Sequence, residues 1–140
     1  AKERLRRLLT LTDDQEILFL AGGASTQFFQ VPMNFLRGGR AAYVETGRWA
    51  TLAAKEAKRF GTVDLIYSSS GSGFDRVPGP GELPPLAEGT KYLHYTSNNT
   101  IYGTQFHHVP EPGDARLVCD MSSDILWAPL DGSRFGLIYA

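Results

Sequence analysis

Residues 18–28 read LFLAGGASTQF: an apolar run leads directly into two glycines and then into small residues that carry hydroxyl groups. The apolar run at 16–21 predicts a short strand buried on both faces, as in a parallel sheet covered by helices. The apolar positions of 25–36 predict a helix, which Pro32 shortens or kinks. A strand, a glycine turn and a helix N-terminus in this order aim free backbone N–H groups at an anion. Residues 22–26 are therefore either a phosphate site or simply a turn, because they match no common nucleotide-binding fingerprint.

Strand and helix patterns alternate along the rest of the chain. Short apolar runs predict five more strands, at 41–44, 63–67, 92–95, 117–119 and 136–139. The spacing of apolar residues predicts an amphipathic helix at the N-terminus that ends near residues 10–14, and another at 46–60 that ends at Gly61. The proline-rich stretch that follows residue 68 predicts a surface loop. This order favours one α/β domain, a three-layer α/β/α arrangement around a mostly parallel sheet.

The composition is that of an ordinary globular protein. Hydrophobic residues make up 42% of the chain and charged residues 21%, with a net charge of -1, so the basic excess of a nucleic-acid-binding protein is missing. No window is apolar for long enough to predict a membrane span, and the N-terminus has no signal-peptide core. Cys119 is the single cysteine, which favours a reducing compartment, and we expect the cytoplasm.

Four segments are candidates for ligand binding, because ligands of open α/β sheets collect beyond the carboxyl ends of the strands. They are 22–26, the surroundings of Trp49, 98–100 and 120–123. Asp120 ends an apolar run, and a buried carboxylate needs either a cationic partner, such as a ring nitrogen, or the N–H groups of a following turn. Trp49 is either a core residue or a platform for a ligand, and 98–100 is either a contact or a polar turn.

A metal site is not predicted. The chain has three histidines and one cysteine, at positions 94, 107, 108 and 119, but their spacing matches no zinc pattern. Adjacent histidines in a strand would also point to opposite faces. A serine hydrolase is disfavoured as well, since the GxSxG turn is missing.

Four segments, in order along the chain, carry a family resemblance. They read LFLAGGASTQFFQVPMNFL (18–36), AAYVETGRWATLAAKEAKRFG (41–61), YLHYTSNNTIYGTQF (92–106) and DMSSDILWAPLDGSRFGLIYA (120–140). Together they resemble the phosphoserine aminotransferase family, whose members are pyridoxal-phosphate (PLP) enzymes with the aspartate-aminotransferase fold, fold type I. The similarity runs over residues 1–140, so the resemblance implies a PLP-dependent transaminase.

The resemblance assigns PLP-binding roles to five residues. It implies that Ala24 and Ser25 bind the cofactor phosphate at the helix N-terminus, and that Trp49 stacks on the pyridine ring. It implies that Thr100 contacts the phenolic oxygen and that Asp120 pairs with the ring nitrogen. A charge pair of this kind, about 4 Å apart, is worth roughly 4 kcal/mol at an effective dielectric constant near 20.

The resemblance also implies what lies outside the matched segments. The Schiff-base lysine of the family follows the segment matched by GLIYA, which places it just after Ala140 and leaves no catalytic residue within the chain. Residues 1–140 would be part of the cofactor-binding large domain, without the N-terminal segment and the small C-terminal domain, of a longer homodimeric enzyme. An antiparallel strand of that enzyme would lie between 16–21 and 135–140.

The implied reaction exchanges an amino group between phosphoserine with 2-oxoglutarate and 3-phosphohydroxypyruvate with glutamate, a step of serine biosynthesis. Some relatives have Gly-Arg at positions 24–25, which here shifts phosphate binding toward backbone and hydroxyl groups. Either serine of 122–123 would orient the Asp120 carboxylate or contact phosphate. Two alternatives remain open: another small-substrate PLP aminotransferase, of the alanine or serine–glyoxylate type, and a non-catalytic module that binds a phosphate ligand.

Overall fold

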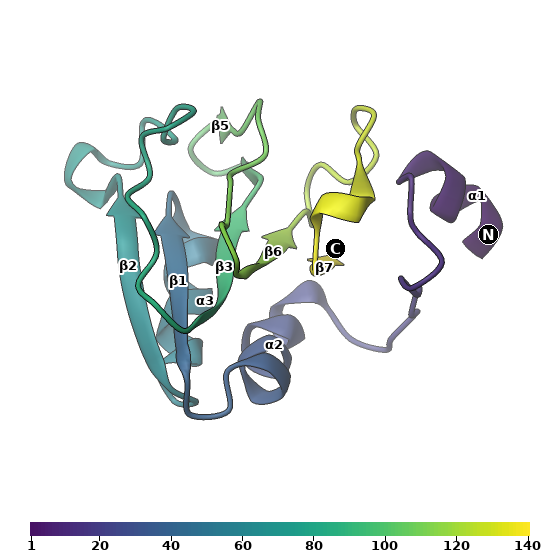
Figure 1. Cartoon of the computed structure of the whole chain (residues 1–140). Helices are drawn as coiled ribbons and strands as arrows, with labels where there is room; N and C mark the ends of the chain where they lie inside the picture. The colour runs from purple at the N-terminus through teal and green to yellow at the C-terminus, as the bar shows by residue number, and fades with distance from the viewer.

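A parallel sheet of five strands forms the centre of the computed structural model, which describes residues 1–140 (Figure 1). The strands run in the order β2-β1-β3-β6-β7, and every neighbouring pair is parallel. Their bounds are β1 Arg40–Glu45, β2 Thr62–Ser68, β3 Thr90–Thr96, β6 Arg116–Asp120 and β7 Leu137–Tyr139. These are the five strands predicted at 41–44, 63–67, 92–95, 117–119 and 136–139, with small differences at their ends.

Two helices, α2 (Gln27–Phe35) and α3 (Arg48–Ala57), cover one face of the sheet. Alternate strand residues explain the two layers of core. Ala41 and Tyr43 of β1 pack in the cluster that includes both helices, whereas Ala42 and Val44 point to the other face, where loop residues cover them. The prediction of a mostly parallel sheet with flanking helices is confirmed, and loops take the place of a helical layer on the second face.

The remaining elements are short. They are the helix α1 (Lys2–Leu8), the two-stranded antiparallel hairpin of β4 (Asn98–Asn99) and β5 (Thr104–Gln105), and the 3-10 turns η1 (Ala24–Thr26), η2 (Ser70–Ser72) and η3 (Gly132–Arg134). The hairpin was not among the predicted strands. No helix of the chain is both long and apolar enough to cross a bilayer.

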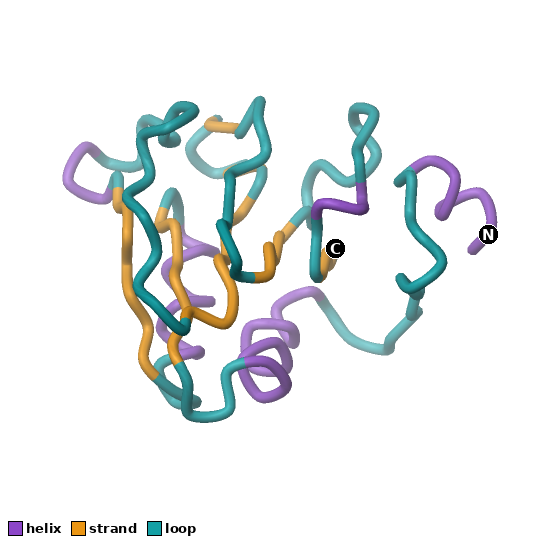
Figure 2. The backbone as a smooth tube through the Cα atoms, in the orientation of Figure 1, coloured by secondary structure: helices purple, strands orange, loops and turns teal.

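The strand predicted at 16–21 is wrong. This segment makes no backbone–backbone hydrogen bond, and Leu18, Phe19 and Leu20 are 69%, 66% and 61% exposed. Figure 2 shows it as a loop that runs from α1 to α2 outside the sheet. An apolar run indicates burial, but a strand also needs a neighbour that completes its hydrogen-bond ladder. The sheet ends at β7, and no strand pairs with this segment.

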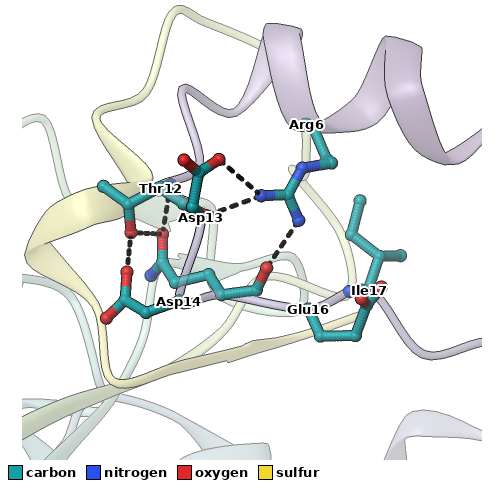
Figure 3. A network of polar contacts seen from close by, with 7 residues as sticks. Arg6, Thr12, Asp13, Asp14, Glu16 and Ile17 are labelled. Carbon is teal, nitrogen blue, oxygen red and sulfur yellow. Dashed lines mark hydrogen bonds and ion pairs between the residues drawn. The ribbon is translucent and has the colours of Figure 1, made fainter.

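A polar network joins residues 6–17 (Figure 3), and Gln15 attaches this network to the end of the chain. The guanidinium of Arg6 donates to the carbonyl of Gln15 at 2.5 Å and to that of Thr12 at 2.6 Å. The amide of Gln15 then donates to the carbonyls of Gly132 and Phe135, at 2.8 and 2.9 Å. Residues 1–15 are therefore fixed beside β7, although residues 16–21 join no strand.

Candidate functional site

The carboxyl ends of the parallel strands bring several polar residues to one edge of the sheet. Thr96 of β3 lies opposite Asp120 of β6, and Asp120 lies opposite Tyr139 of β7. The three side chains therefore share one rung and one face of the sheet, the face that α2 and α3 cover. Thr46 and Gly47 follow β1 at the same edge.

Asp120 is the buried charge of this edge, with only 4% of its surface exposed. Its Oδ1 accepts hydrogen bonds from the Ser122 N–H at 3.0 Å and from the Ser122 hydroxyl at 2.5 Å. Burial raises the pKa of Asp120, whereas Ser122 and the nearby Tyr139 hydroxyl lower it, and Asp124 raises it slightly. The second oxygen, Oδ2, makes no hydrogen bond of good geometry within the chain, so this carboxylate can accept a further hydrogen bond.

Trp49 lies in the first turn of α3 and is 41% exposed. The start of this helix is fixed by a buried contact with the hairpin. The Asn99 amide donates to the Thr46 hydroxyl at 3.1 Å, and both residues are at most 2% exposed. Gly47 allows this approach, because a Cβ at that position would lie 2.6 Å from Asn99 Oδ1.

Thr100 lies at the exposed turn between β4 and β5. Its hydroxyl oxygen accepts a long hydrogen bond, 3.4 Å, from the Asn98 amide, so its own proton is free to donate. Asn98 also connects this turn to the segment after Asp120. The Asn98 amide donates to the Ser123 hydroxyl oxygen at 3.0 Å, and the Ser123 hydroxyl lies 3.2 Å from the Asn98 carbonyl. Thr100 and Asp120 are thus joined through residues of two neighbouring strand ends.

Ala24 and Ser25 form the turn that leads into α2, and their N–H groups make no hydrogen bond within the chain. Gly22 precedes them with φ +111°, a conformation that favours glycine. The Thr26 hydroxyl donates to the Gly23 carbonyl at 2.8 Å, so its proton is not available to a phosphate. The helix that follows places Phe28 against the ring of Tyr139, 6.4 Å between centroids, so this turn lies at the same end of the sheet as Asp120.

The structure thus places the five predicted residues around one edge, with different surroundings. Asp120 is buried, Trp49, Thr100 and Ser25 are exposed, and Ala24 is half-buried. Their roles in binding remain predictions. No group of three metal-ligating side chains occurs in the chain.

Sequence reasoning missed the residues that hold this edge together. The Thr46–Asn99 pair lies 53 positions apart in the sequence, and the partnership of Asp120 with Tyr139 arises only from strand order. The sequence does show polar residues at the strand ends, which indicates a site. Which of them pair can be predicted only when the strand order and register of the sheet are known.

The residues present fit a ligand with a cationic nitrogen beside a flat ring and an anionic tail. Asp120 offers an unused carboxylate oxygen, Trp49 offers an exposed aromatic face, and the turn at 24–25 offers unpaired N–H groups. A model of the aminotransferase class-V family matches residues 1–140. The chain belongs to the class-V aminotransferase family.

The curated relatives of the chain include phosphoserine aminotransferases. The chain is 50% identical over 141 residues to the phosphoserine aminotransferase of Azotobacter vinelandii, covering 100% of this chain and 39% of the relative. It is 51% identical over 137 residues to that of Desulfotalea psychrophila, covering 97% of this chain and 37% of the relative. The chain therefore spans less than two fifths of the curated relatives it matches.

Solved structures agree with this assignment. The phosphoserine aminotransferase of Bacillus circulans subsp. alkalophilus superimposes with a TM-score of 0.93 at 47% identity, covering 99% of this chain and 38% of that one. The PLP-bound phosphoserine aminotransferase of Trichomonas vaginalis superimposes with a TM-score of 0.84 at 35% identity, covering 98% of this chain and 39% of that one. The expected fold is confirmed by both.

Proposed function

We propose that residues 1–140 form part of the PLP-binding domain of a phosphoserine aminotransferase. The observation that carries this proposal is the buried Asp120 carboxylate, with one oxygen held by Ser122 and the other unused, at the edge that also bears Trp49 and Thr100. A buried carboxylate with an unused oxygen is costly unless a cationic donor joins it. A protonated pyridine nitrogen is such a donor.

Each residue of the edge has a distinct task in this proposal. Asp120 accepts the ring N–H and keeps that nitrogen protonated. Trp49 stacks on the ring, the Thr100 hydroxyl donates to the phenolic oxygen, and the N–H groups of Ala24 and Ser25 hold the phosphate with the free Ser25 hydroxyl. Bound PLP supplies an electron sink for the substrate carbon that loses its α-proton.

The substrates follow from the relatives. Phosphoserine aminotransferases that are about 50% identical in sequence match the whole chain. This supports transfer of the amino group of glutamate to 3-phosphohydroxypyruvate. In the reverse direction the substrates are phosphoserine and 2-oxoglutarate. The lysine that carries out covalent chemistry and the groups that bind the substrate phosphate would lie outside residues 1–140, in the N-terminal and C-terminal parts of a longer protein.

We propose further that this protein is a homodimer in the cytoplasm. Exposed apolar side chains near residues 18–20 and 125–127 support an additional cover from the rest of the enzyme or a second subunit. The single cysteine, which is buried, supports a reducing compartment. Light scattering of the full-length protein should give the mass of two subunits, and the mass of a monomer would contradict the proposed homodimer.

The full-length protein provides the test. It should bind PLP with a shifted absorbance band and transfer the amino group of glutamate to 3-phosphohydroxypyruvate. Asp120→Ala should keep the fold, shown by circular dichroism, and lose most turnover. Asp114→Ala is the matched control, because Asp114 is exposed before the other end of β6. Full-length protein that binds no PLP would refute the assignment, and unchanged turnover in Asp120→Ala would refute the role of Asp120.

A further inference from the structure

A group of buried polar rings lies directly beneath Asp120, on the sheet face covered by the helices. The hydroxyls of Tyr43 and Tyr92 lie 2.8 Å apart, and His94 Nε2 lies 3.0 Å from the Tyr139 hydroxyl. The imidazole stacks on the Tyr43 ring, with centroids 4.6 Å apart and an angle of 21° between the planes. All four residues are at most 7% exposed. The tasks described above use none of them.

Tyr139 brings this group into contact with the site. It lies opposite Asp120 in the β6–β7 register, so the two side chains are neighbours on one face. The Tyr139 hydroxyl is near enough to the carboxylate to lower the pKa of Asp120, although no hydrogen bond of good geometry joins them in this structure. The Phe28 ring packs against it from α2 and restricts its movement.

The protons of this group can be assigned by elimination. His94 is neutral, because burial lowers its pKa to about 3, and it therefore carries one N–H. Nδ1 of His94 is buried and has no hydrogen-bond partner. A proton on Nδ1 would therefore leave a buried N–H donor unpaired. The Tyr139 proton would then point at Nε2, and the hydroxyl lone pairs would face the carboxylate. With the proton on Nε2, the imidazole donates to the Tyr139 oxygen, and the hydroxyl proton is free to face Asp120.

We propose that His94 and Tyr139 are positioning residues for Asp120: the Nε2–H of His94 fixes the Tyr139 hydroxyl so that its proton faces the carboxylate and keeps it ionised. That an ionised Asp120 then keeps the ring nitrogen of a cofactor protonated rests on the proposed function, whereas the tautomer of His94 does not. Neither residue touches the cofactor in this arrangement.

Other groups that act on this carboxylate are few. Asp124 raises its pKa slightly, and Ser122 lowers it. Cys119, whose pKa is raised by burial, lies next to it in β6, and Tyr92 lies further down the face. The helix α2, which packs over Tyr139, carries no titratable side chain. A variant of Tyr139 therefore changes one neighbour of Asp120 and leaves these groups in place.

The first experiment measures the tautomer in the full-length, cofactor-free protein. Nitrogen-15 NMR of histidine-labelled protein distinguishes a protonated Nε2 from a protonated Nδ1, and the His94 signal is identified by its loss in His94→Gln. We expect the proton on Nε2 at neutral pH. A proton on Nδ1, or a charged imidazolium, would overturn the inference whether or not the protein binds PLP.

The second experiment measures PLP affinity against pH. Tyr139→Phe keeps the ring and removes the hydroxyl. The acid limb of the curve of PLP affinity against pH should therefore move to higher pH by about half a unit to one unit, which corresponds to the loss of one weak hydrogen bond. Tyr92→Phe is the matched control: it removes a buried hydroxyl that bonds to Tyr43 and should leave the limb in place. Equal limbs in the two variants would overturn the inference.

A pair of His94 variants covers the case in which Tyr139→Phe does not fold. His94→Leu removes the donor to Tyr139 and should move the acid limb in the same direction, whereas His94→Gln supplies an N–H and should restore it. A structural role alone would give no rescue by glutamine. If no variant and no wild-type protein binds PLP, the proposed function has failed, and the tautomer measurement still decides this inference.

Discussion

Replacing Gly47 with alanine tests how closely α3 approaches the β4–β5 hairpin. A Cβ at Gly47 would lie 2.6 Å from Asn99 Oδ1 and 3.2 Å from Tyr102 Cδ2. The φ of Gly47 is 174°, which is extended backbone that alanine adopts without strain. Any loss of stability therefore comes from the close approach and not from the backbone.

The size of the loss follows from what has to move. Asn99 is 2% exposed, and rotating its amide away breaks the 3.1 Å hydrogen bond to Thr46. A lost neutral hydrogen bond costs about 1 kcal/mol, and a buried amide without a partner costs about 1–3 kcal/mol more. Alanine returns roughly 0.4–1 kcal/mol by restricting the unfolded chain. We expect a net loss of about 1–3 kcal/mol.

Urea unfolding of the full-length, cofactor-free protein measures this loss as a lower midpoint with an unchanged slope. Gly71→Ala is the control, because no atom lies within 4 Å of a Cβ there and its backbone is not left-handed. PLP affinity should fall as well in Gly47→Ala, since α3 carries Trp49 two residues further on. A Gly47→Ala midpoint equal to that of Gly71→Ala would refute the claim that this contact is tight.

Three further changes have defined outcomes. Burial raises the pKa of Asp120 above 3.8, so ionisation of this carboxyl group destabilises the folded protein as pH rises. Asp120→Asn should therefore raise the thermal midpoint of the cofactor-free protein at pH 7. The gain should become smaller as the pH falls toward about 4. Trp49→Ala should weaken PLP binding by about 1 kcal/mol, roughly fivefold, in fluorescence titrations, whereas Trp127→Ala, at a site that is also exposed to solvent, should not. Leu36→Ala, at a site 1% exposed, should cost about 2–5 kcal/mol in urea unfolding, and Leu8→Ala, 56% exposed, less than about 0.5 kcal/mol.

The sheet could be predicted from sequence because its central strands are buried on both faces. In the middle of β1, β3 and β6, at 41–44, 92–95 and 117–119, the side chains on both faces of the sheet are apolar or aromatic, so each strand contains one continuous apolar run. The glycines and the proline-rich loop then mark where the runs end. Local sequence information is therefore sufficient where burial alone identifies a strand.

Local sequence information is not sufficient at residues 16–21 or at the β4–β5 hairpin. The run ILFLA has the composition of a buried strand, but its state depends on a partner at another place in the chain, and none is present among the five strands. The hairpin has the opposite problem, since Asn98 and Asn99 are typical turn residues. They pair with Thr104 and Gln105 because Asn99 is also held by Thr46 of a neighbouring strand end.

The candidate site shows the same division between local and distant information. Asp120 could be identified because a carboxylate that ends an apolar run is unusual wherever it occurs. Tyr139 and His94 could not, since each looks like one more aromatic or polar residue in a buried strand. Their proximity to Asp120 depends on β6 and β7 being neighbours, which only the assembled sheet decides. Residues that adjust the charge of a site are therefore harder to find in a sequence than the charge itself, and the surroundings of a buried carboxylate are the place to look for them.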